Sequence, residues 1–159
     1  MRQFTFAVCS AFAVLGLLVG ASQASAQGAD VRVGTWKQNF MKSTGTGPAP
    51  QSSTRTYEAF EGDGVKFTQV AIAANGTRTT NTYDGHLDGK VLVWTGSTTQ
   101  DAIAMKRNSA NSFDFTLSKA GKAQSTGRNL VSSDGKTMYV VNLSSSTGQI
   151  LNVGVYEKQ

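Results

Sequence analysis

The chain has 159 residues, a formal net charge of +5, one cysteine and one histidine. A single cysteine, Cys9, excludes an intramolecular disulfide, and the basic residues are scattered singly apart from Lys106 and Arg107. Because nucleic-acid binding needs a basic stripe or patch, the charge predicts no such partner, and we interpret it as a solvated surface.

Residues 1–26 have the pattern of a secretory signal peptide. Arg2 gives a positive start, an apolar run extends through residues 11–19, and residues 24–26 (ASA) form a small-residue cleavage pattern. The apolar run is too short to span a bilayer as a stable helix. We expect cleavage after this pattern, leaving residues 27–159 as one exported domain, periplasmic or extracellular, with no transmembrane segment. An uncleaved N-terminal anchor is the alternative interpretation.

The expected mature chain begins with a predicted strand and a long loop. The strand covers residues 30–40, with Trp36 expected in the core or on the floor of a barrel. Residues 43–53 (STGTGPAPQSS) follow, where Pro48 and Pro50 prevent regular strand pairing. Lids and binding loops occur at such lengths, but the segment lacks a helical period, so an ordinary surface loop is favoured.

The middle of the chain predicts three strands separated by glycine-containing turns, at residues 54–60, 65–73 and 77–83. Asn75-Gly76, between the last two, is the strongest short hairpin signal. In the strand at 65–73 the apolar alternation changes phase at Thr68-Gln69, which predicts a β-bulge.

Two further strands are predicted at residues 90–95 and 101–107. The first (KVLVWT) is almost wholly apolar, so either both of its faces are covered or Trp94 lies on the rim. The second places Ile103 and Met105 on one face.

The last third of the chain predicts four strands joined by three tight turns. In the first of them Phe113, Phe115 and Leu117 share one face and polar residues the other, as in a half-buried strand. Glycine in each turn supplies the positive φ that hairpin loops require. The four predicted strands are Ser112–Lys119, Lys122–Val131, 136–144 and 149–157.

The chain therefore carries about ten short strands, with frequent turns and no helical period. Because every connection after residue 53 is short, sequence neighbours should pair antiparallel. A long meander exposes its edges unless it closes on itself. The sequence thus predicts an all-β fold, a single antiparallel up-and-down β-barrel of about 8–10 strands.

Two fragments carry a family resemblance. Residues 34–42 (GTWKQNFMK) resemble the opening of fatty-acid-binding proteins and the Gly-Xaa-Trp signature of lipocalins, and residues 155–158 (VYEK) resemble the close of the former. The turn pattern from Tyr83 onward further resembles exported bacterial proteins of unassigned function that are described as lipocalin-like. The resemblance implies a lipocalin-like, or calycin, β-barrel that holds one small hydrophobic molecule.

The sequence departs from that family in two places. The two-helix lid between the first two strands is replaced by the loop at residues 43–53, and the Arg-Xaa-Tyr that holds a fatty-acid carboxylate reads Gly154-Val155-Tyr156. Since a buried carboxylate needs a charged partner, we expect a neutral ligand unless Arg128 supplies the cation. Arg128 itself shares a face with Gln124 and Thr126, which predicts that it is exposed.

Motifs of catalysis and metal binding are not recognisable. His86 stands in a turn beside Asp84 and Asp88, whereas a metal site needs several converging ligands. The sequence has no Gly-Xaa-Ser-Xaa-Gly elbow, phosphate loop or dinucleotide fingerprint. We therefore expect no enzymatic activity, no cofactor and no metal.

Two functional hypotheses follow. The first is a monomeric barrel that binds a small neutral hydrophobic molecule in its interior. The second is a β-module with a filled core that binds a partner protein or glycan through a patch around Trp94 and the loop at 43–53. Barrel size permits both, and alternation leaves open which face of the final strand points inward. The candidate lining residues are Trp94, Phe113, Phe115, Met138, Val140 and Tyr156.

Overall fold

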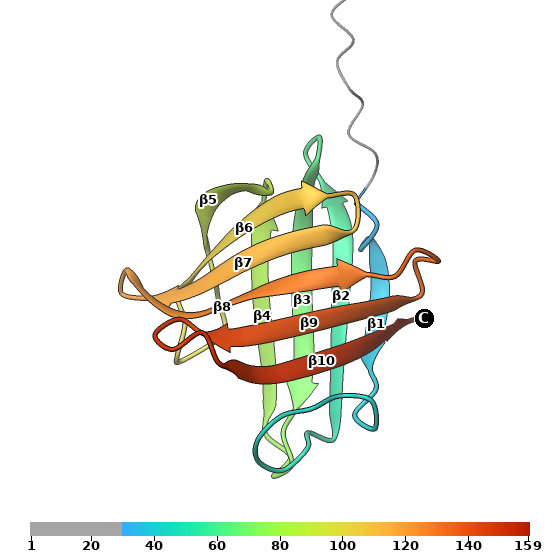
Figure 1. Ribbon diagram of the computed structural model, residues 1–159, viewed down its shortest axis with the longest axis vertical. Coiled ribbons are helices and arrows are strands. Elements are labelled where there is room, and N and C mark those ends of the chain that lie inside the picture. The colour runs from blue at the N-terminus through green and yellow to red at the C-terminus, as the bar shows by residue number, and fades with distance from the viewer. Residues whose placement is uncertain (1–29) are drawn as a thin grey trace, which may run out of the picture.

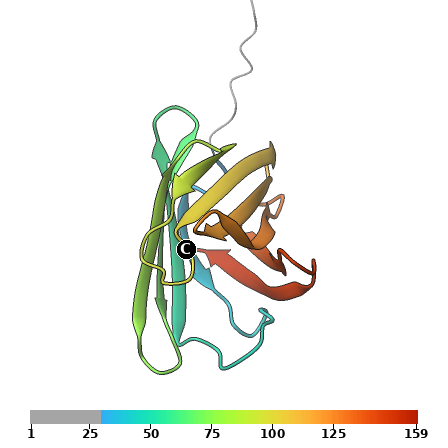
Figure 2. The ribbon, with the colours of Figure 1, turned by 90° about the vertical axis from the view of Figure 1, so that its left-hand side faces the viewer.

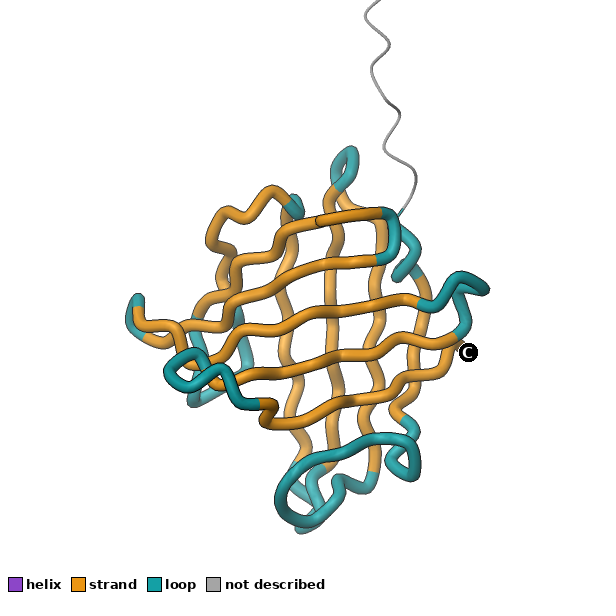
Figure 3. The backbone as a smooth tube through the Cα atoms, viewed as in Figure 1, coloured by secondary structure: helices purple, strands orange, loops and turns teal. Residues whose placement is uncertain are grey.

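The computed structural model describes residues 30–159, and the expected signal peptide lies outside this part of the chain. Residues 30–159 form ten strands joined by turns and loops (Figures 1 and 3). No helix in this part is long and apolar enough to cross a membrane. The strands are β1 (Gly34–Gln38), β2 (Ser52–Phe60), β3 (Gly64–Ile72), β4 (Arg78–Gly85), β5 (Asp88–Val93), β6 (Ala102–Ser109), β7 (Ser112–Lys119), β8 (Lys122–Val131), β9 (Thr137–Ser144) and β10 (Ile150–Lys158).

All ten strands belong to one antiparallel sheet with the order β4-β3-β2-β1-β10-β9-β8-β7-β6-β5. Sequence neighbours pair throughout, and the β1–β10 pair brings the two ends of the chain together. Figures 1 and 2 show two layers, in which β6–β10 cross over β1–β4. The prediction of an all-β up-and-down barrel is confirmed.

The barrel is nearly closed, with a seam between β4 and β5. A single bridge joins Thr82 of β4 to Thr95, just after β5, and their hydroxyl oxygens lie 2.6 Å apart. Gly96 follows directly with φ near +80°, and a Cβ there would overlap the carbonyl oxygen of Thr80. Glycine therefore allows the chain to approach β4 closely enough to close the seam.

The predicted bulge in the third strand is wrong. β3 pairs with β2 and with β4 without a register shift across Thr68 and Gln69. The apolar phase changes because Gln69 faces the barrel interior, while Val70 and Ile72 lie on the partly exposed outer face. The alternation of the backbone continues, and only the polarity of the inward residue changes.

The end of the barrel where β1 begins is closed by a buried arginine. Arg32 is fully buried, with its guanidinium carbon 3.8 Å from the ring centroid of Phe113 and 4.9 Å from that of Tyr57. Trp36, also fully buried, donates from Nε1 to the carbonyl oxygen of Arg32 at 2.7 Å. This confirms Trp36 as a core residue, and it explains why β1 starts only at Gly34, after the turn that places Arg32 inside.

Candidate functional site

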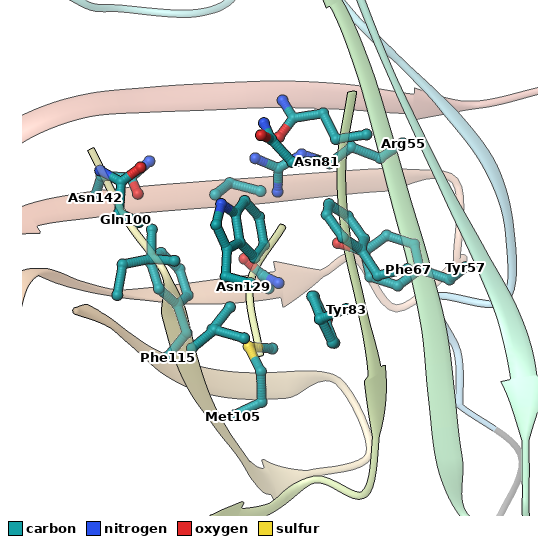
Figure 4. Close-up of a pocket in the computed structure, with 15 residues that line it drawn as sticks. Arg55, Tyr57, Phe67, Asn81, Tyr83, Gln100, Met105, Phe115, Asn129 and Asn142 are labelled. Carbon is teal, nitrogen blue, oxygen red and sulfur yellow. The ribbon is translucent and has the colours of Figure 1, made fainter. Parts of the chain in front are cut away.

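The barrel interior contains a cavity of about 190 Å³. Figure 4 shows its lining side chains, which come from strands of both layers and, for Trp94 and Gln100, from the segment between β5 and β6. Small barrels either fill their interior with side chains or hold one small ligand, and the hollow is compatible with the second arrangement. Its aromatic lining residues are Tyr57, Phe67, Tyr83, Trp94 and Phe115. Its polar lining residues are Arg55, Gln69, Asn81, Gln100, Asn129 and Asn142.

Three of the aromatic rings form one stacked cluster in the cavity wall. Phe67 and Tyr83 face each other across β3 and β4 with ring centroids 4.8 Å apart, and Trp94 stacks on them at 5.7 and 5.9 Å. The planes differ by only 22° to 25°, so the three rings form offset-stacked pairs, a favourable geometry for aromatic side chains. Trp94 thus lies inside the barrel and not on its rim, whereas Val91 and Val93 of β5 are exposed.

Four buried polar atoms on the cavity wall have no hydrogen-bond partner within residues 30–159. Two are donors, Arg55 Nε and Trp94 Nε1, and two are acceptors, the side-chain oxygens of Asn81 and Asn129. A buried polar atom without a partner costs about 1–3 kcal/mol, and such atoms are rare in folded proteins. The cavity is therefore equipped to hydrogen-bond a molecule placed inside it.

Arg55 is the cation of this cavity. Its guanidinium carbon lies 4.5 Å from the ring centroid of Tyr156 and 5.8 Å from that of Phe67. Burial alone would lower the pKa of Arg55, but the neighbouring Tyr156 and Tyr57 outweigh it and raise the pKa above its ordinary value. Sequence reasoning missed this residue, although alternation places Arg55 on the same inward face of β2 as Tyr57.

The cavity adjoins a wider hollow of about 670 Å³ at the mouth of the barrel. The two hollows share Arg55, Gln69, Val140 and Asn142 as lining residues, and residues 43–50 of the long loop line the outer one. The loop is tied to β10, because Thr44 and Val153 exchange backbone hydrogen bonds of 2.9 and 3.0 Å. The loop expected to be an ordinary surface loop therefore borders the route into the barrel, at the opposite end from β1's start (Figure 1).

The six candidate lining residues fall into three groups. Trp94, Phe115 and Val140 line the cavity, and Val140 and Tyr156 line the mouth. Phe113 and Met138 are fully buried but line neither hollow. Whether any of the six binds a ligand remains a prediction.

The orientation of the last strand is settled by Tyr156. It is 3% exposed and lines the mouth together with Asn152 and Gly154, so this face of β10 points inward. Leu151, on the opposite phase, borders the mouth as well, but it is 45% exposed.

The two remaining candidates from the sequence lie on the surface. Arg128 faces outward and pairs through two nitrogens with the carboxylate of Asp114, as expected for a solvated face. His86 Nδ1 lies 2.9 Å from Asp63 Oδ1 across two turns, and both side chains are half exposed. Within residues 30–159, no group of three metal-ligating side chains converges.

No protein-family model matches the chain, and no curated protein does. The likeness to lipocalins and fatty-acid-binding proteins therefore rests on the short motifs quoted above and on the barrel architecture. What the structure establishes is a ten-stranded antiparallel up-and-down barrel around a buried aromatic cluster.

Proposed function

We propose that the protein is an exported, non-catalytic, lipocalin-like barrel that binds one small molecule in its internal cavity. The observation that carries this proposal is the combination of a stacked aromatic wall with unpartnered buried polar atoms around one hollow. Ligand sites typically pair a mostly apolar lining with a few placed polar groups. Export rests on the signal-peptide pattern of residues 1–26.

The size of the cavity limits the part of the ligand that it can enclose. A dry cavity of about 150 Å³ takes up benzene, whereas drug-sized ligands occupy about 300–1,000 Å³. At about 190 Å³ the cavity fits a single ring with small substituents. Any longer group would extend into the mouth beneath the loop at residues 43–50.

The chemistry of the lining supports binding without catalysis. Among the described residues that line the cavity there is no aspartate, glutamate, histidine, cysteine or serine to act as nucleophile or general base. Tyr83 is no substitute, because burial raises its pKa above the ordinary value.

The lining of the cavity changes two of the hypotheses drawn from the sequence. The preference for a neutral ligand rested on the absence of a cation from β10, and Arg55 of β2 removes that premise. The surface-module hypothesis placed Trp94 in an exposed patch, whereas Trp94 is partly buried and stacks on Phe67 and Tyr83, which weakens that hypothesis.

A pair of neighbouring substitutions tests the proposed function. Val140 is 2% exposed and lies between cavity and mouth, so Val140→Phe should obstruct the site, while Val141→Phe adds the same bulk to the outer face of β9. We expect wild-type protein to bind ring-sized aromatic probes such as phenol, indole or benzoate in a saturable 1:1 manner by calorimetry. Val140→Phe should weaken binding about tenfold or more, consistent with an overpacking cost of about 1–3 kcal/mol.

Circular dichroism serves to check that both variants fold. Val141→Phe should retain wild-type affinity for the probes. Failure of every probe to bind wild-type protein would contradict the proposal. Equal losses in the two variants would place the binding site elsewhere.

A further inference from the structure

The geometry points to a more specific ligand class, an inference that rests on the proposed function. We propose that the cavity selects a small planar acid, an aromatic carboxylate that also bears a hydroxyl or amino group. Its carboxylate pairs with Arg55, its ring lies on the wall formed by Phe67, Tyr83 and Trp94, and its donor reaches the buried asparagines.

The case for a negative charge comes from comparing the two interior arginines. Arg32 has a protein carboxylate, with its terminal nitrogen 2.8 Å from Asp30 Oδ2. Arg55 forms no ion pair within residues 30–159, and its described partners are the rings of Phe67 and Tyr156 and the side chain of Tyr57, with which it forms a hydrogen bond. The neighbouring tyrosine rings stabilise the charge on Arg55 but do not neutralise it, so the site favours an anionic ligand over a neutral one.

A carboxylate suits Arg55 better than a single acceptor would. The guanidinium offers donors in a fixed planar fork that matches two carboxylate oxygens, and Arg55 Nε is one of the unpartnered donors. Arg55 also lines both the cavity and its mouth, so an incoming anion meets this cation at the entrance.

The shape of the cavity favours a ring over a chain. The stacked rings of Phe67, Tyr83 and Trp94 line the cavity, and a planar aromatic molecule gains from offset stacking on an aromatic side chain. The volume of about 190 Å³ is close to that of a substituted benzene and leaves no room to enclose a long acyl chain.

The asparagines require a hydrogen-bonding group on the ring. Asn129 is 3% exposed, its side-chain oxygen is unpartnered, and Asn81 offers a second such oxygen (Figure 4). Trp94 Nε1 needs an acceptor in the same cavity. Because a hydroxyl donates one hydrogen bond and also accepts, a single hydroxyl on the ring can donate to one of the asparagine oxygens and accept from the indole donor.

The test compares four probes on the intact mature protein by calorimetry at about pH 7. They are 4-hydroxybenzoate, its methyl ester, benzoate and palmitate. We expect 4-hydroxybenzoate to bind about tenfold or more tightly than the ester, which keeps the ring and the hydroxyl but lacks the charge. Benzoate should bind several-fold more weakly than 4-hydroxybenzoate, and palmitate should not displace it.

The variant Arg55→Met tests the role of the interior arginine. The control is Arg128→Met, which removes an arginine on the outer surface. Arg55→Met should abolish the preference for the acid over the ester while Arg128→Met retains it. The melting temperature of Arg55→Met should stay close to that of wild-type protein, because methionine fills the same inward position and Arg55 has no carboxylate partner within residues 30–159. A clear drop would show that Arg55 is structural and would overturn the assignment.

The outcomes separate this inference from the proposed function. If acid and ester bind wild-type protein equally well and saturably, the acid specificity is overturned and the cavity remains a binding site. If benzoate matches 4-hydroxybenzoate, the role of the asparagines is overturned. If no aromatic probe binds, charged or neutral, the proposed function fails together with the inference.

Discussion

Phe115→Ala should lower the free energy of unfolding by about 3–5 kcal/mol, the usual cost of truncating a buried phenylalanine. Phe115 is 7% exposed in the middle of β7, where it pairs with Gly127 of β8. A Cβ at Gly127 would overlap both the Phe115 ring and the carbonyl oxygen of Val141. The glycine therefore makes room for the ring, and urea unfolding followed by circular dichroism measures what that packing contributes.

The neighbouring residue provides the control. Asp114 points outward on the same strand and pairs with Arg128, both side chains being about half exposed. Exposed ion pairs contribute about 0–1 kcal/mol, so Asp114→Ala should change the unfolding free energy by no more than that. Similar losses in the two variants would contradict the inward orientation of Phe115.

The predictions for the last third of the chain were accurate for a physical reason. In β7 the apolar and polar residues alternate strictly, and hairpin turns with glycine fix the register of its partner β8. Both strands coincide with their predicted ranges. Closure of the barrel could be predicted because unpaired sheet edges are unfavourable, whichever side chains fill the interior.

The polar interior could not be predicted in the same way. The rule that apolar residues face inward predicts a bulge at the phase change, because a bulge would bring Val70 and Ile72 to the same face as Val65 and Phe67. In the structure Gln69 lines the cavity and those two residues face outward. A polar residue inside is stabilised by partners from other strands or by a ligand, and neither is encoded in the strand's own period.

The burial of the two interior arginines could not be predicted from the hydrophobic pattern either. Arg55 shares its phase with Tyr57, so strict alternation would have placed it inside, against the expectation that arginine is exposed. Arg32 lies in a turn before β1, where no period applies, and only the fold brings Phe113 and Tyr57 against it. Deviations from the hydrophobic pattern thus coincide here with the candidate site and with the closed end of the barrel.

Asp30→Ala should produce a loss of similar size to that of Phe115→Ala, about 3–5 kcal/mol, because it leaves the buried Arg32 without its counter-charge. The Asp30 carboxylate accepts hydrogen bonds from Arg32 Nε at 3.1 Å and from its terminal nitrogen at 2.8 Å, and Arg107 approaches to 3.4 Å. The exposed Asp63, which pairs with His86, is the control, and Asp63→Ala should cost at most about 1 kcal/mol. Equal losses from the two substitutions would show that the buried pair contributes no more than a surface contact.

The same residue predicts how stability depends on pH. Burial alone would raise the pKa of Asp30, but hydrogen bonds and charge from Arg32 outweigh it and hold the pKa below its ordinary value. A carboxyl group with a lower pKa in the folded state stabilises the protein above its unfolded pKa of about 3.9, and this contribution is lost as the pH falls through the folded pKa. The unfolding free energy of wild-type protein should therefore decrease more steeply below about pH 4 than that of Asp30→Asn. Urea unfolding of both proteins across this range provides the measurement, and parallel profiles would show that Asp30 is not the group that titrates.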